Sequence, residues 1–94
     1  MPLADESPTA TRRYLVLAMR RPGFDPAMVA PHLAFLDRLR AEGRLELAGA
    51  FTDRSGGAYL LRAADLDAAR AIASADPLQA SGSSTLTVRE WNAA

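Results

Sequence analysis

Residues 26–53 read PAMVAPHLAFLDRLRAEGRLELAGAFTD, and this stretch predicts a helix, its stop and the strand that follows. One face of an amphipathic helix follows from the three- and four-residue spacing of Val29, Leu33 and Leu36, with Leu39 or Arg40 as its next position. Gly43 provides the C-terminal stop. Larger or apolar positions then alternate with polar or small ones, as in a strand: Leu45, Leu47, Gly49 and Phe51 against Glu46, Ala48, Ala50 and Thr52.

A proline interrupts the start of this helix. Asp25 is a good N-cap and Pro26 suits the first helical position, so a short helical turn is expected there. Pro31 lacks the N–H that a continuous helix needs in its interior. We therefore expect the main helix to restart at Pro31 and to run to Glu42, with His32, the single histidine of the chain, in its first turn.

The flanking segments complete the fold. Residues 13–19 (RYLVLAM) are apolar on both faces, which indicates a central strand. The range from Arg44 to Ala63 reads as a β-hairpin with its turn at DRSGG, and DLDAARAIASAD is a second amphipathic helix capped by Asp65. The stretch PLQASGSS breaks that helix, and TLTVREW is a last strand. The order β-α-β-β-α-β predicts a ferredoxin-like α+β fold, a four-stranded antiparallel sheet with two helices on one face.

Length and composition limit the classes of protein that are possible. The chain has 94 residues, which suits one domain over 12–94 after a loose leader at 1–11. Eleven basic residues balance eleven acidic ones, which argues against nucleic-acid binding and against a membrane-surface protein. The absence of cysteine excludes disulfides and thiolate chemistry and fits the cytoplasm, where we expect the protein to reside.

One face of the predicted sheet has no helix to cover it. Apolar residues of the first strand and of the hairpin point to both faces of the sheet. A large exposed apolar sheet face is uncommon on a monomer. We therefore expect a homodimer that packs sheet on sheet about a two-fold axis.

The segments PHLAFLDRLRAEGRLELAGAFTD, GGAYLLRAADLDAARAIASADPL and TVREW together resemble the YciI-like (YCII-related) family of small dimeric α+β barrel proteins, from Tyr14 to Trp91. The resemblance implies a small-molecule enzyme with a His and Asp pair in a pocket, and one relative is a dehydrochlorinase of chloroaromatic breakdown. The matching motifs assign the pair to His32 and Asp76. The chain departs from the family pattern at Ala50, where proline is usual, and at SGS, where AGV is usual.

Elementary chemistry supports a His32–Asp76 pair without reference to the family. Imidazole takes and gives protons near neutrality, and a carboxylate on its other nitrogen fixes the tautomer. Asp37 lies five positions after His32 and points elsewhere, whereas Asp76 ends the second helix, which runs antiparallel to the first. The ordinary interpretations stay open: His32 as a packed first-turn residue and Asp76 as a turn residue.

Other residues complete the expected site. The expected pocket wall consists of Gly49, Phe51, Tyr59, Pro77 and Ser81. The alternatives are structural: a bulge at Gly49 and core positions for the two aromatic residues. Arg20 and Arg21 either hold an anionic substrate or lie in a solvated loop. A serine nucleophile drawn from Ser81, Ser83 or Ser84 has little support.

Two functions remain. The first is an enzyme of lyase, isomerase or dehydrochlorinase type that acts on a small substrate, aromatic or lactone-like. The second is a non-catalytic dimeric module that binds a small ligand or a partner protein. We expect neither a metal nor a cofactor, because one histidine without cysteine gives no usual metal cluster and no phosphate-binding loop is present.

Overall fold

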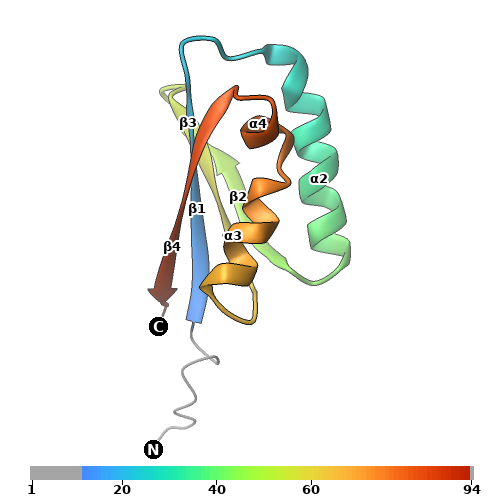
Figure 1. Cartoon of the computed structure of the whole chain (residues 1–94), viewed down its shortest axis with the longest axis vertical. Helices are drawn as coiled ribbons and strands as arrows, with labels where there is room; N and C mark the ends of the chain where they lie inside the picture. The colour runs from blue at the N-terminus through green and yellow to red at the C-terminus, as the bar shows by residue number, and fades with distance from the viewer. Residues whose placement is uncertain (1–11, 94) are drawn as a thin grey trace, which may run out of the picture.

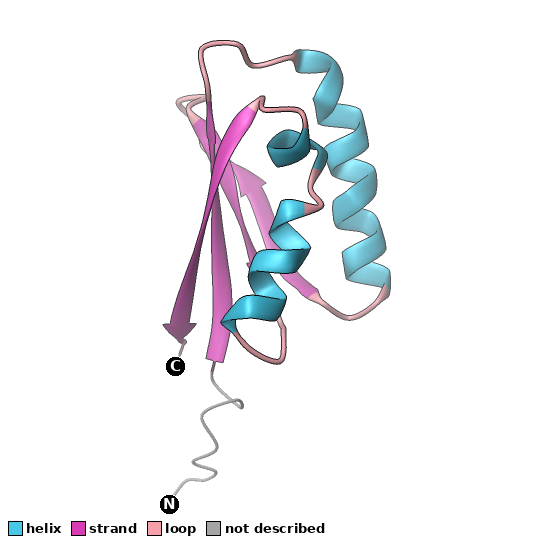
Figure 2. Cartoon of the chain, in the orientation of Figure 1, coloured by secondary structure: helices cyan, strands magenta, loops and turns pink. Residues whose placement is uncertain are grey.

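The computed structural model describes residues 12–93 and contains the predicted elements in the predicted order. They are β1 (Arg12–Arg20), the 3-10 turn η1 (Pro26–Met28), α2 (Val29–Ala41), β2 (Leu45–Ala50), β3 (Gly56–Leu61), α3 (Leu66–Ser74), α4 (Pro77–Ala80) and β4 (Ser84–Asn92). The sheet is antiparallel with the order β2-β3-β1-β4, and the helices lie together on one face of it (Figures 1 and 2). The ferredoxin-like α+β fold is confirmed, and the expected leader at 1–11 lies outside the described residues.

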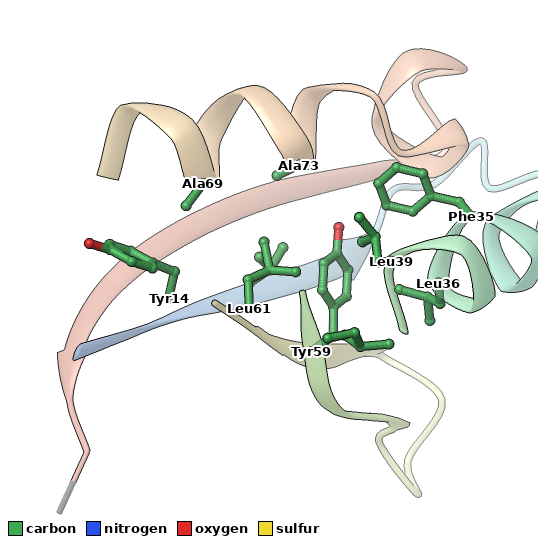
Figure 3. Close-up of a cluster of buried hydrophobic side chains, with 10 residues drawn as sticks. Tyr14, Phe35, Leu36, Leu39, Tyr59, Leu61, Ala69 and Ala73 are labelled. Carbon is green, nitrogen blue, oxygen red and sulfur yellow. The ribbon is translucent and has the colours of Figure 1, made fainter. Parts of the chain in front are cut away.

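The core lies between the sheet and the helices. β1 is a central strand that pairs with β3 and with β4. Its alternate residues Tyr14, Val16 and Ala18 are buried on the side that faces the helices. Figure 3 shows Leu61 and Tyr59 of β3 between this strand and the helices. The helices contribute apolar side chains to the same cluster: Phe35, Leu36, Leu39, Ala69 and Ala73. Because those helix positions are three or four apart, they form one apolar stripe on each helix.

The start of α2 differs from the prediction. The expectation that the helix restarts at Pro31 was wrong by two residues, because η1 leads directly into α2 at Val29. Pro31 then lies in the first helical turn, where backbone N–H groups have no intrahelical partner and the missing donor costs nothing. The C-terminal prediction is confirmed, since Gly43 follows the helix with a φ of 75°, a left-handed conformation that favours glycine.

A β-bulge changes the faces of β2. The pairing with β3 shifts between Leu45 and Leu47, so Leu45 is buried under the helices while Leu47 lies on the open face with 69% of its surface exposed. The expected alternation, with both leucines on one face, was therefore wrong. Glu46 occupies the bulge and forms ion pairs with Arg13 and Arg62. Desolvation opposes the charge of Glu46, but these two arginines outweigh it and lower the pKa of the carboxyl group.

A one-turn helix, α4, replaces the expected break after α3. Asp76 caps it, since its Oδ1 accepts the N–H of Leu78 at 2.9 Å, and Pro77 occupies the first helical position. Asp65 caps α3 as predicted and accepts the N–H of Ala68. Among residues 12–93, no helix has the length and apolar character needed to cross a membrane.

Candidate functional site

The helix-covered face of the sheet is hollow at one end. Ala50, Gly57 and Ala18 lie side by side across β2, β3 and β1. Because these side chains are so small, a cavity of about 260 Å³ remains beside them. Residues of α2 and α4 form the opposite wall: Val29, His32, Leu33, Leu36 and Leu78. Most of the lining is apolar, as is usual for a small-molecule site.

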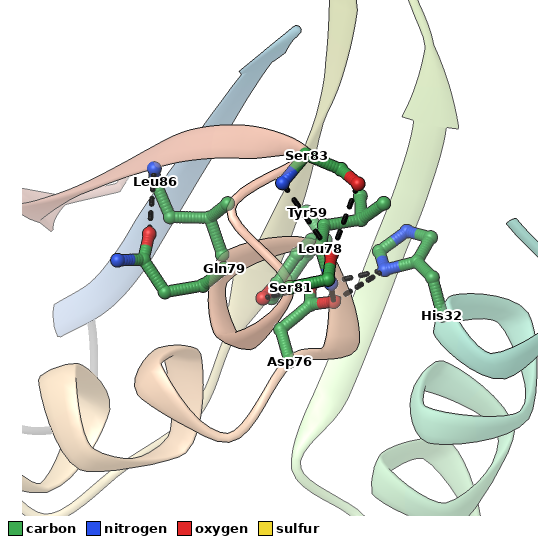
Figure 4. A network of polar contacts seen from close by, with 8 residues as sticks. All are labelled: His32, Tyr59, Asp76, Leu78, Gln79, Ser81, Ser83 and Leu86. Atoms are coloured by element: carbon green, nitrogen blue, oxygen red, sulfur yellow. Dashed lines mark hydrogen bonds and ion pairs between the residues drawn. The ribbon is translucent and has the colours of Figure 1, made fainter. Parts of the chain in front are cut away.

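His32 and Asp76 meet at this cavity. The His32 Nδ1 lies 2.9 Å from Oδ1 and 3.0 Å from Oδ2 of Asp76 (Figure 4). The pairing follows from the topology, because α2 begins where α3 ends and the two helices run in opposite directions (Figure 1). A carboxylate only accepts, so Nδ1 carries the hydrogen and Nε2 is the nitrogen with a free lone pair.

Asp76 is fully buried, with 0% of its surface exposed. Three donors reach its two oxygens: the His32 ring, the Leu78 N–H and the Tyr59 hydroxyl, the last at 2.8 Å. These contacts compensate a buried carboxylate for the water that it has lost. Asp76 therefore holds together α2, α4 and β3 at one point.

Tyr59 is a fixed hydrogen-bond donor in this arrangement. Burial raises the pKa of Tyr59 well above its usual value, and the nearby charge of Asp76 and the hydrogen bond to it act in the same direction. The phenol is therefore neutral at physiological pH and donates its hydrogen bond to Asp76. Tyr59 thus contacts the same carboxylate that contacts His32.

The structure brings some of the predicted site residues together. His32, Tyr59 and Gly49 line the cavity, and Asp76 lies directly behind His32. Phe51 lies on the open face of the sheet, in a shallow hollow with Leu47 and Trp91, because the bulge in β2 shifts the strand's alternation. Pro77 and Ser81 do not line the cavity; the Ser81 hydroxyl instead contacts the Ser83 hydroxyl at 2.9 Å.

Several contributions to the site were not predicted from the sequence. Tyr59 was expected as a wall residue, and its hydrogen bond to Asp76 was not foreseen. Leu78 and Ser84 also line the cavity. A signal existed for Tyr59: it alternates with Gly57 and Leu61, which places it on the helix side, and a buried tyrosine hydroxyl needs a partner. No such signal marked Leu78, since its position depends on the unforeseen turn of α4.

The described residues contain no group of three or more histidine, cysteine or carboxylate side chains that is arranged to hold a metal ion. The Nδ1 atom of His32 is already paired with Asp76. For proton transfer, the site offers the imidazole of His32 beside a largely apolar cavity. That arrangement is suited to proton transfer with a small organic molecule.

Known proteins resemble this chain in sequence and in fold. A family model described as the YCII-related domain matches residues 12–92. The uncharacterized protein YjpA of Bacillus subtilis (strain 168) is 54% identical over 78 residues, which cover 83% of this chain and 92% of that protein. The structure of 5-chloro-2-hydroxyhydroquinone dehydrochlorinase (TftG) from Burkholderia phenoliruptrix AC1100, in complex with 2,5-dihydroxybenzoquinone, aligns with a TM-score of 0.67 at 22% identity over 84% of this chain and 92% of that one. At this identity the similarity to TftG is one of fold.

Proposed function

Because the chain belongs to the YCII-related domain family, we propose that it is a small-molecule enzyme in which His32 is the general acid or base and Asp76 orients its imidazole. One observation carries the proposal. The Nδ1 atom of His32 is 2.9 Å from a carboxylate that is fully buried, while the same ring lines the cavity. A histidine that serves only packing does not need a buried carboxylate behind it.

The proposed chemistry begins at the Nε2 atom of His32, which removes a proton from the substrate. Asp76 stabilises the imidazolium that forms, as a carboxylate does behind a catalytic histidine. The imidazolium then returns the proton to another atom in an isomerisation, or keeps it while a leaving group departs in an elimination. Tyr59 and the Leu78 N–H hold the carboxylate in place throughout.

We propose a small, planar and cyclic substrate. The cavity of about 260 Å³ accepts one substituted six-membered ring, and its lining is mostly apolar. TftG, which shares the fold, is named for an aromatic substrate that loses chloride, and it was captured with a hydroxylated quinone. A dehydrochlorination or a related elimination is therefore the reaction to test first.

We propose that the partner of this chain is a second copy of itself, packed through the open face of the sheet. That face exposes four large apolar side chains: Leu47, Trp91, Met19 and Phe51. An apolar surface of this kind is typical of an interface. Sedimentation equilibrium should give a dimer mass for the wild type and a monomer mass for Leu47→Asp, and a monomeric wild type would contradict this part of the proposal.

The test of the enzyme proposal compares His32→Gln with the wild type. Chloride release from 5-chloro-2-hydroxyhydroquinone should fall by about 100-fold or more in the variant, since that is the usual contribution of a general acid or base. Binding of 2,5-dihydroxybenzoquinone should be retained, because glutamine preserves most of the wall. Asp67→Asn, a change at an exposed residue of α3 that lies outside the cavity lining, is the matched control and should keep full activity.

A non-catalytic binding module is the alternative, favoured by the largely apolar lining of the cavity. It predicts ligand binding without turnover in the wild type. Equal turnover by wild type and His32→Gln would also contradict the mechanism, because the reaction would then not use the imidazole.

A further inference from the structure

Two polar residues lie at the end of the cavity formed by β1 and β4. Arg20 and Ser84 are directly paired across these strands, and both line the cavity. Side chains two residues apart on a strand point to the same face of the sheet. Arg20 therefore lies on the helix side with Ala18, and Ser84 lies there with Leu86. The Cβ atoms of such a pair lie about 5 Å apart.

Ser84 is buried without a partner for its hydroxyl group. Only 3% of the residue is exposed, and its Oγ forms no hydrogen bond within the described part of the chain. Buried hydroxyls are almost always paired, so an unpaired one that borders a cavity points to a ligand. The neighbouring serines do not behave in this way, because Ser83 and Ser81 contact each other through their hydroxyls.

Arg20 supplies a positive charge at the same place. Its guanidinium lies over the Phe24 ring, 4.2 Å from the ring centre, and Phe24 also lines the cavity. Stacking occupies a face of the guanidinium and leaves its N–H groups, which lie in the plane, free to donate. Within residues 12–93, Arg20 has no carboxylate partner, whereas Arg40 at the same cavity is paired with Asp37 at 2.9 Å.

We propose that Arg20 and Ser84 bind an anionic oxygen of the substrate, so that the substrate class is a small planar ring with an ionised carboxylate or phenolate group. This inference rests on the proposed function and specifies its substrate. The guanidinium and the hydroxyl donate to the anionic oxygen, and the stacked Phe24 and the small side chains of the sheet floor accept the ring. His32 then meets the ring from the α2 wall.

The test uses benzoate, 4-nitrophenolate and neutral benzamide as probes, with NMR titration that follows the His32 ring signals. The wild type should bind at least one anion about tenfold more tightly than benzamide, as expected for a charged hydrogen bond. Arg20→Met should remove that preference and leave benzamide binding unchanged. Arg21→Met is the matched control, since it removes the same charge from a neighbouring residue outside the cavity lining, and it should keep the preference.

Ser84→Ala tests the second donor. The free protein should be as stable as the wild type, because the lost hydroxyl has no partner, yet anion affinity should fall about threefold. A preference for benzoate over 4-nitrophenolate, or the reverse, identifies the anionic group.

The outcomes separate this inference from the proposed function. If the anions and benzamide bind equally well at His32, or if Arg20→Met keeps the preference, the Arg20–Ser84 site is overturned while the His32 enzyme remains. If none of the probes shifts the His32 signals, the inference is overturned as well. Loss of turnover in His32→Gln, measured separately, then still supports the enzyme.

Discussion

The two ends of the helix-covered sheet face are built from the same strands but from side chains of different size. At one end Tyr14, Leu61 and Leu45 fill the space beneath α3 and α2 and are almost completely buried. At the other end Ala50, Gly57 and Ala18 leave a cavity, and the group buried beside it is the carboxylate of Asp76. The filled end stabilises the fold because apolar side chains are buried there. The hollow end buries less apolar surface and leaves space for a ligand.

The largest effect that we predict is at the hollow end. Asp76→Ala should lower the free energy of unfolding by about 4 kcal/mol, because three donors around a fully buried carboxylate lose their acceptor. Asp65→Ala removes a cap from an exposed position and should cost about 1 kcal/mol. Urea denaturation of both variants measures the difference. Similar losses would mean that Asp76 is a capping residue and no more.

The filled end should respond to lost volume. Leu61 has 0% of its surface exposed, so Leu61→Ala should cost about 3 kcal/mol through lost burial and the space left behind. Ligand binding at the far end should be retained in the folded fraction. Chemical denaturation and the titration with benzoate check the two statements, and a variant that lost binding while folded would show that the ends are coupled.

Added volume should separate the two ends most clearly. Ala69→Leu places a large side chain in a filled region and should cost about 2 kcal/mol. Ala50→Leu extends into the cavity and should change stability by less than about 0.5 kcal/mol, as at a surface position. It should nevertheless weaken probe binding strongly. A large loss of stability in Ala50→Leu would contradict the view that this end is open to a ligand.

Much of the fold and part of the candidate site could be predicted from the sequence. Hydrophobic periodicity gave the order of strands and helices, and the antiparallel run of the two helices explained how His32 and Asp76 could meet. The bulge at Glu46 could not be predicted, because Glu46 pairs there with Arg13 of β1 and with Arg62, which follows β3. That single insertion moved Phe51 away from the cavity. The cavity itself was also hidden, since it arises from alanine and glycine residues that become neighbours only through strand register.

The smallest predicted effect concerns Tyr59, whose hydroxyl donates a hydrogen bond to Asp76 of the His32–Asp76 pair. Tyr59→Phe should lower the free energy of unfolding by about 1 kcal/mol near neutral pH, because Asp76 loses one hydrogen bond. It should also change the alkaline behaviour. In the wild type, the pKa of Tyr59 is raised above its usual value of 10.0, so its contribution is present below that pH and is lost as the pH rises.

The composition of the chain simplifies this measurement. The chain has no lysine that would titrate near pH 10, and Tyr59 is one of only two tyrosines. Above pH 10, the unfolded state releases the Tyr59 proton while the folded state keeps it, so wild-type stability should fall by up to about 1.4 kcal/mol per pH unit. Tyr59→Phe lacks this contribution, and urea unfolding curves of the two proteins should converge as the pH rises. If the gap between them stayed constant, the Tyr59 hydroxyl would not be tied to a buried carboxylate, and the support for the His32–Asp76 pair would be weaker by one hydrogen bond.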